Sequence, residues 1–170
     1  MALPEHGLSK DEILERLEAK RANDARWRDG RTFGMVYDPA LHSVHEVAEA
    51  VAVAFLHENA LNTKAFPSLG EIQSEVCGIA ADLFNGGPDA AGFMTSGGTE
   101  SILSAVKAAR ERGRIERGVT EPEMVLAESA HAAFHKAAHY FGVRVHKTPV
   151  GPDWRAQPER FAEHVNDNTV

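Results

Sequence analysis

The sequence predicts an α/β fold in which an N-terminal helical segment precedes the first βαβ units of a larger domain. Up to about residue 90, apolar residues recur at helical spacing between loops rich in Gly and Pro. From Ala91 onward, short apolar runs typical of buried strands alternate with helical patterns. Such alternation is typical of a mostly parallel sheet.

The N-terminal segment is expected to contain two helices. Ser9 and Glu12 have the spacing of a capping box, so the first helix should begin directly after Ser9. A second helix is expected over residues 42–60, with Pro39 suited to its first turn.

A third helix is expected behind a second capping-box pattern, formed by Ser68 and Glu71. Its apolar residues share one helix face, and the Gly- and Pro-containing run at 85–90 should end it. We place the boundary between the two parts here: 1–67 is expected to be a helical segment, and 68–170 the first part of a larger domain.

The C-terminal part should alternate strands and helices. An α/β domain rarely stops at the first residues of a strand, so we expect this chain to be the N-terminal part of a longer, truncated protein. The expected elements are a strand (91–95), a helix ending at Gly113 (96–113), a strand (123–129), a helix ending at Gly142 (130–142), a strand (143–150), a helix (157–167) and the start of a strand (168–170).

Composition excludes several classes of protein. The formal net charge of -7 argues against binding driven by nucleic-acid phosphates. One cysteine, Cys77, permits no disulfide within the chain, which fits a reducing compartment. The N-terminus lacks the pattern of a signal peptide, and the longest apolar run, at 47–56, is too short to span a bilayer. We therefore expect a cytoplasmic protein without a transmembrane segment.

The residues 95–100, "TSGGTE", combine a predicted strand end, a tight turn and a helix start. Unpaired N–H groups and the helix dipole make such a helix start a site for anions. Gly97 and Gly98 would let a phosphate approach the backbone, and Ser96 and Thr99 would add hydroxyl donors. The run is neither a P-loop nor G-x-G-x-x-G. A plain turn with Ser96 as helix N-cap is the alternative.

Three histidines, His131, His135 and His139, share one helix face. Ala132 stands where a metalloprotease helix carries its general base, and no cysteine is near, so we predict no metal site. His131 is different, because it follows a strand end at the sheet edge where ligands of α/β proteins collect, and could stack on a flat cofactor there. Lys136 lies in the middle of the helix and is expected to face solvent.

Two stretches carry a resemblance to a known family: "LFNGGPDAAGFMTSGGTESILSAVKAAR" (83–110) and "SAHAAFHKAAHYFGVRV" (129–145). They closely resemble the sphingosine-1-phosphate lyase family of fold-type I, pyridoxal-phosphate-dependent enzymes, related to the group II decarboxylases. The similarity extends from about Thr32 to the C-terminus. It implies an aminotransferase-like large domain, pyridoxal 5'-phosphate as cofactor, and a homodimer with shared active sites.

The resemblance also implies roles for single residues. His131 would stack on the pyridine ring, and Tyr37 would reach an active site, possibly that of the partner subunit. Asn59 and Asn62 fall on the family stretch that holds the substrate phosphate, where Asn62 replaces a family histidine. The cofactor phosphate would be held by Ser96, Gly97, Gly98 and Thr99.

The implied reaction is carbon–carbon cleavage of a phosphorylated sphingoid base to a fatty aldehyde and phosphoethanolamine, an aldehyde-lyase step of sphingolipid metabolism. An amino-acid decarboxylase (carboxy-lyase) of the same fold and a catalytically inactive interaction module are the alternatives. We expect the 170 residues alone to be inactive, because no lysine here matches the family's Schiff-base lysine. The lysines compared are Lys10, Lys20, Lys64, Lys107, Lys136 and Lys147.

Overall fold

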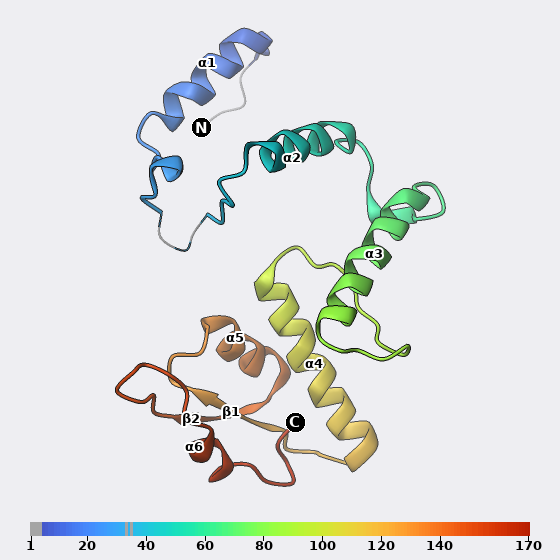
Figure 1. Ribbon diagram of the computed structural model, residues 1–170, viewed down its shortest axis with the longest axis vertical. Helices are drawn as coiled ribbons and strands as arrows, with labels where there is room; N and C mark the ends of the chain where they lie inside the picture. The colour runs from blue at the N-terminus through green and yellow to red at the C-terminus, as the bar shows by residue number, and fades with distance from the viewer. Residues whose placement is uncertain (1–4, 33, 35) are drawn as a thin grey trace. The chain divides into compact units, whose positions relative to one another are not determined.

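The computed structural model describes residues 5–32, 34 and 36–170 of the chain. It divides into two compact units, Met1–Phe66 and Pro67–Val170 (Figure 1). Among the helices described, none combines the length and the apolar character needed to cross a membrane.

The first unit is helical. The capping box predicted at Ser9 is confirmed: its hydroxyl oxygen accepts from the Glu12 N–H at 3.3 Å, and its own N–H donates to the Glu12 carboxylate at 2.8 Å. The elements of this unit are α1 (Lys10–Arg21), a 3₁₀ turn (Trp27–Asp29), α2 (His42–Ala54) and a second 3₁₀ turn (Ala60–Asn62).

For the second helix the predicted start at His42 is confirmed, but the placement of Pro39 in its first turn and its predicted end were wrong. Pro39 lies outside α2, because Ala40 adopts a positive φ of 55° and the Asp38 carboxylate accepts from the Ala40 N–H at 2.9 Å. The chain therefore turns before the helix begins at His42. At the other end α2 stops at Ala54 with Phe55 as its C-cap, and the polar run 57–59 follows after Leu56.

The second unit carries the sheet. Strands β1 (Glu123–Ala127) and β2 (Arg144–Thr148) pair in parallel, with Glu123 opposite Arg144, as the alternating pattern predicted. Thr169 forms a further parallel bridge to Glu123, so the expected start of another strand is also present. The helices of this unit are α3 (Pro67–Leu83), α4 (Gly98–Arg117), α5 (Ala132–Phe141) and α6 (Pro158–Ala162).

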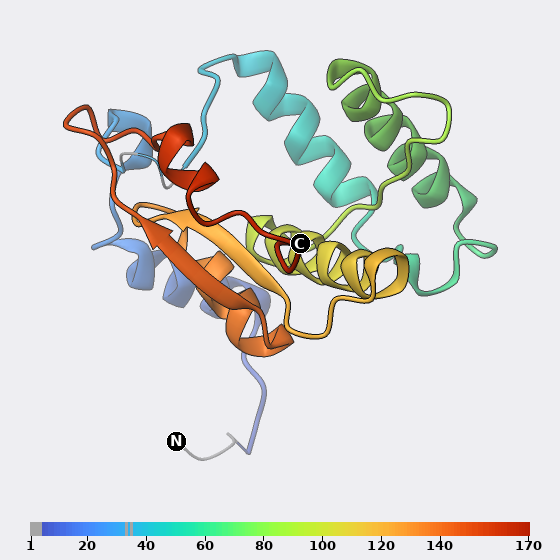
Figure 2. The same cartoon turned by 90° about the horizontal axis from the view of Figure 1, so that it is seen from below.

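The core of this unit lies where α4 and α5 pack against each other and the sheet. Figures 1 and 2 both show the sheet between α5 on one side and α6 on the other. Three alanines of α5, Ala133, Ala137 and Ala138, are almost fully buried, which lets the helix approach its neighbours closely. The buried cluster comprises Val106, Met124, Leu126, Ala137, Ala138 and Val143.

Two predictions before α4 were wrong. Residues 91–95 form no strand, because they have no backbone ladder partner in the part of the chain described here; the Met94 N–H instead donates to the Gln73 side chain at 3.1 Å. Ser68 does not cap α3, since the helix already begins at Pro67 and includes it. Proline suits the first position of a helix, where no N–H is needed.

The predicted end of α4 at Gly113 was wrong as well. The helix continues to Arg117 and ends at Gly118, which takes the left-handed conformation at φ 68°. Gly113 is instead a packing glycine: a Cβ there would lie 2.5 Å from a methyl carbon of Val170. The absence of a side chain lets the C-terminal segment lie against α4.

The last helix is also shorter than predicted. α6 ends at Ala162 instead of continuing to residue 167. The Asn166 N–H donates to the Thr169 hydroxyl at 2.9 Å, and the Asn168 N–H donates to the Asn166 side chain at 2.8 Å. These bonds hold the chain in a turn that leads into the bridge with β1.

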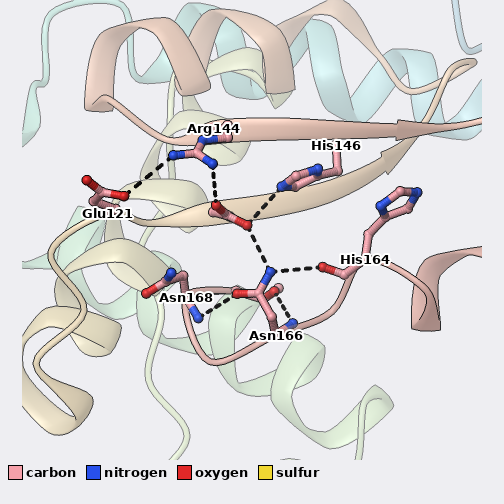
Figure 3. Close-up of polar contacts among 8 residues, drawn as sticks. Glu121, Arg144, His146, His164, Asn166 and Asn168 are labelled. Carbon is pink, nitrogen blue, oxygen red and sulfur yellow. Dashed lines mark hydrogen bonds and ion pairs between the residues drawn. The ribbon is translucent and has the colours of Figure 1, made fainter.

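A buried carboxylate ties this turn to the sheet (Figure 3). Glu123 is 5% exposed, and its side chain contacts the Arg144 guanidinium at 3.0 Å and the His146 ring nitrogen at 2.8 Å. The Asn166 amide donates to the same carboxylate at 2.9 Å. The rings of His146 and His164 stack, with centroids 5.4 Å apart. One side chain of β1 thus connects β2 and the C-terminal turn.

We expect Gly113→Ala to destabilise the protein. The new Cβ would clash with Val170, and such overpacking costs about 1–3 kcal/mol. Gly78→Ala in α3 is the matched control: a Cβ there meets nothing within 4 Å, so helix propensity should leave stability unchanged or raise it by up to about 1 kcal/mol. Denaturant unfolding of both variants checks this, and equal effects would contradict the packing role of Gly113.

Acid should weaken the second unit through Glu123. The hydrogen bonds from Asn166 and then from His146 hold the pKa of its carboxyl below the ordinary value of 4.5. A carboxyl whose pKa is lowered in the folded state stabilises the fold at pH values above its ordinary pKa. This contribution is lost as the pH falls through the lowered pKa.

We therefore expect Glu123→Gln to lower the free energy of unfolding at neutral pH and to flatten its decline in acid. The measurement is denaturant unfolding as a function of pH. Glu121→Gln, which removes an exposed carboxylate 3.5 Å from Arg144, should keep the wild-type decline. Parallel acid profiles for Glu123→Gln and the wild type would refute the role of Glu123.

Candidate functional site

The turn before α4 has an open outer side. Gly97 is the N-cap of α4, with φ 157° and ψ 174°, a conformation that residues with a side chain rarely adopt. A Cβ built on Gly97 or on Gly98 would meet nothing within 4 Å. The N–H groups of the first helical turn have no partner within the helix. An anion can therefore approach these donors without meeting a side chain.

Hydrogen bonds between Ser96 and Glu100 hold the turn in place. The N–H and the hydroxyl of Ser96 donate to one oxygen of the Glu100 carboxylate, at 2.7 and 2.6 Å. The Ser96 hydroxyl, and then its N–H, lower the pKa of the Glu100 carboxyl. The alternative in which Ser96 is the N-cap was wrong, since Gly97 holds that position. Sequence reasoning missed this pair, although its i,i+4 spacing is visible in the sequence.

His131 lies directly beyond β1 and is the N-cap of α5. Its ring nitrogen Nδ1 accepts from the Ala133 N–H at 3.1 Å, so the neutral ring carries its proton on Nε2. This bond fixes the ring on its helix, and the residue is exposed. The imidazole is thus oriented by the backbone while its outer nitrogen stays accessible.

The glycine turn and His131 lie at the same edge of the sheet. The Arg110 guanidinium, in the C-terminal half of α4, donates to the Phe141 carbonyl at the end of α5 at 3.0 Å. The two helices therefore run in the same direction, opposite to β1 (Figure 1). Both begin at the carboxyl end of β1, the edge where ligands of open α/β sheets collect.

A hollow of about 410 Å³ adjoins the turn along α4. Its walls are mostly small and apolar, so it offers few donors for an anion. The anion donors thus lie at the turn and not in the hollow. The lining residues are Ala91, Gly92, Phe93, Thr95, Ser101, Ser104, Ala105 and Ala108.

The residues predicted on the substrate side belong to the first unit. Tyr37 is 90% exposed. Asn59 caps the second 3₁₀ turn by accepting from the Leu61 N–H at 3.1 Å, and the Asn62 side chain accepts from the Lys64 N–H at 3.0 Å. The structure brings the two asparagines into one short turn. Their role with Tyr37 at a shared site stays a prediction.

The remaining histidines of α5 form no metal centre in the residues that the structure describes, where no group of three or more His, Cys, Asp or Glu side chains is suited to hold an ion. Lys136 is exposed, as predicted, and its ammonium lies 5.4 Å from the centre of the Tyr140 ring.

The fold defines the class of protein first. Over its whole length the chain is similar to the structure of a Burkholderia pseudomallei sphingosine-1-phosphate lyase, with a TM-score of 0.84, 32% identity and 41% of that chain covered. It also matches a Lactobacillus brevis glutamate decarboxylase, at a TM-score of 0.74, 20% identity and 40% coverage, which shows a common fold. The predicted fold class, the first βαβ units of this lyase and decarboxylase fold, is confirmed.

The sequence then narrows the similarity. The chain is 45% identical to sphingosine-1-phosphate lyase 1 of Rattus norvegicus over 168 residues, and 38% identical to sphingosine-1-phosphate lyase of Oryza sativa over 175 residues. No family model matches. The chain is therefore similar over 99% of its length to sphingosine-1-phosphate lyases, the family that the two sequence stretches resemble. It spans only 29% and 32% of the lengths of these two relatives.

Proposed function

We propose that this chain is part of a pyridoxal-phosphate-dependent carbon–carbon lyase that cleaves phosphorylated sphingoid bases to a fatty aldehyde and phosphoethanolamine. The observation that carries the proposal is the open glycine turn at the start of α4, at the same sheet edge as His131. Similarity over 99% of the chain to proteins named sphingosine-1-phosphate lyase supports the substrate class.

The donor set of the turn fits a phosphate group. Gly97 and Gly98 leave space in front of the helix start, and the first-turn N–H groups and the helix dipole favour an anion there. In this proposal Gly98 and Thr99 bind the cofactor phosphate through their N–H groups, and the Thr99 hydroxyl adds a donor. These contacts would fix the position of the cofactor relative to the sheet.

His131 would orient the other end of the cofactor. The bond from the Ala133 N–H holds its ring at the start of α5, so the imidazole can stack on a planar pyridine ring and limit its rotation. When bound, pyridoxal phosphate supplies the electron sink for cleavage of the carbon–carbon bond. The residues of this chain supply binding and orientation.

The substrate side and the assembly are part of the same proposal. Asn59 and Asn62 hold the substrate phosphate through their side-chain NH₂ groups, while their oxygens cap the local turn. Tyr37 completes an active site shared between two subunits of a homodimer. A cytoplasmic location is supported by the single cysteine.

An amino-acid decarboxylase is the second candidate. The observation that favours it is 34% identity over 139 residues to a protein named probable L-tyrosine/L-aspartate decarboxylase of Methanothermobacter thermautotrophicus. Asn62, where the lyase family has a histidine, weakens the expected charged contact with a substrate phosphate.

Assay of the complete enzyme distinguishes the two reactions. We expect release of phosphoethanolamine and a fatty aldehyde from dihydrosphingosine phosphate, and no carbon dioxide from tyrosine, aspartate or glutamate. Decarboxylation of an amino acid without cleavage of the phosphorylated base would instead establish the second candidate.

The phosphate contact has its own test. Gly98→Ala places a methyl group in the open space beside the first-turn N–H groups. We expect the affinity for pyridoxal phosphate, measured by fluorescence titration of the complete enzyme, to fall about tenfold or more, which corresponds to about 1.4 kcal/mol. The free energy of unfolding should not fall, because alanine favours the helix. Unchanged affinity would place the phosphate elsewhere.

A further inference from the structure

The Glu100 carboxylate stands next to the proposed phosphate site at the start of α4. It is in the first turn of α4, yet both of its hydrogen bonds run back to Ser96, across the N-cap Gly97. An acidic residue beside a phosphate site would ordinarily repel the ligand. Its position therefore calls for a role other than direct binding.

We propose that Glu100 is a positioning residue of the phosphate turn: it fastens Ser96 so that the N–H groups of Gly98 and Thr99 stay directed to the open side. This inference rests on the proposed function. Glu100 does not touch the phosphate in this account. Glu100 acts through Ser96, and the direct contacts belong to Gly98 and Thr99.

The geometry supports a fastening role. Both donors of Ser96 reach the same oxygen, Oε2, at 2.7 and 2.6 Å, so the backbone and the side chain of Ser96 are held together. Between the two residues lie Gly97 and Gly98, and glycine is the residue type with the greatest backbone freedom. Two charge-assisted bonds that span these glycines restrict the freedom of the turn.

A second bond fixes the preceding residue. The hydroxyls of Thr95 and Ser101 lie 2.6 Å apart, and the Thr95 hydroxyl also donates to the Gly97 carbonyl at 3.1 Å. The two residues before the N-cap are thus each tied to α4. Ordering the turn before the ligand arrives lowers the entropy that binding must overcome.

The hydrogen bonds of Glu100 should favour phosphate binding, while its negative charge should oppose it. These opposite effects on binding make the role of Glu100 testable. Removing the bonds loosens the turn and weakens phosphate binding. Removing only the charge relieves repulsion of the phosphate. Glutamine keeps an oxygen that can accept from the Ser96 N–H and hydroxyl but carries no charge. Glu100→Gln and Glu100→Ala therefore separate positioning from electrostatics.

The first experiment measures the affinity of the complete enzyme for pyridoxal phosphate by fluorescence titration. We expect Glu100→Ala to bind about tenfold more weakly and Glu100→Gln to remain within about threefold of the wild type. Glu116→Ala, which removes an exposed carboxylate from the far end of the same helix, is the matched control and should change nothing. Equal or tighter binding by Glu100→Ala, or equal loss in both Glu100 variants, would overturn the proposal.

The second experiment needs no cofactor. Amide hydrogen exchange of the Ser96 N–H should be about tenfold faster in Glu100→Ala than in the wild type and nearly unchanged in Glu100→Gln. Unaltered exchange in Glu100→Ala would refute the fastening role. If the wild-type enzyme binds no pyridoxal phosphate, the proposed function fails, but the exchange of Ser96 still decides whether Glu100 orders the turn.

Discussion

The buried carboxylate of Glu123 is the constraint on which the second unit depends. It lies at the first residue of β1 and joins three segments: the strand itself, β2 through Arg144 and His146, and the C-terminal turn through Asn166. A buried charge is tolerated only when it is paired and hydrogen-bonded, so these partners must stay together. With this end of β1 fixed, its opposite end delivers His131 to a defined place at the edge of the sheet.

Close helix packing then brings the glycine turn to the same edge. Ala133 and Ala137 of α5 are 3% and 0% exposed, and their small side chains let α5 approach the neighbouring elements. Arg110, in the C-terminal half of α4, donates to the Phe141 carbonyl at the end of α5, and the two helices begin at one edge (Figure 1). The geometry of the two helix starts therefore arises from packing far from them.

Local signals in the sequence were sufficient for much of this fold. The strands, the cap at Ser9 and the left-handed end of α5 at Gly142 follow from residues close in sequence. Two of the errors involve distant partners: Gly113 ends no helix because its role is to admit Val170, and residues 91–95 form no strand because no segment in the described part of the chain pairs with them. The sequence also placed the glycine turn and His131 correctly at helix starts, but it did not indicate that Glu100 already takes both donors of Ser96.

The central claim is that the start of α4 binds the phosphate of pyridoxal phosphate while His131 stacks on its ring. A crystal structure of the complete enzyme with the cofactor tests it most directly. The account predicts phosphate oxygens within hydrogen-bonding distance of the Gly98 and Thr99 N–H groups, an intact Ser96–Glu100 pair, and the His131 ring parallel to the pyridine. A phosphate bound away from the start of α4, or a pyridine ring without contact to His131, would contradict it.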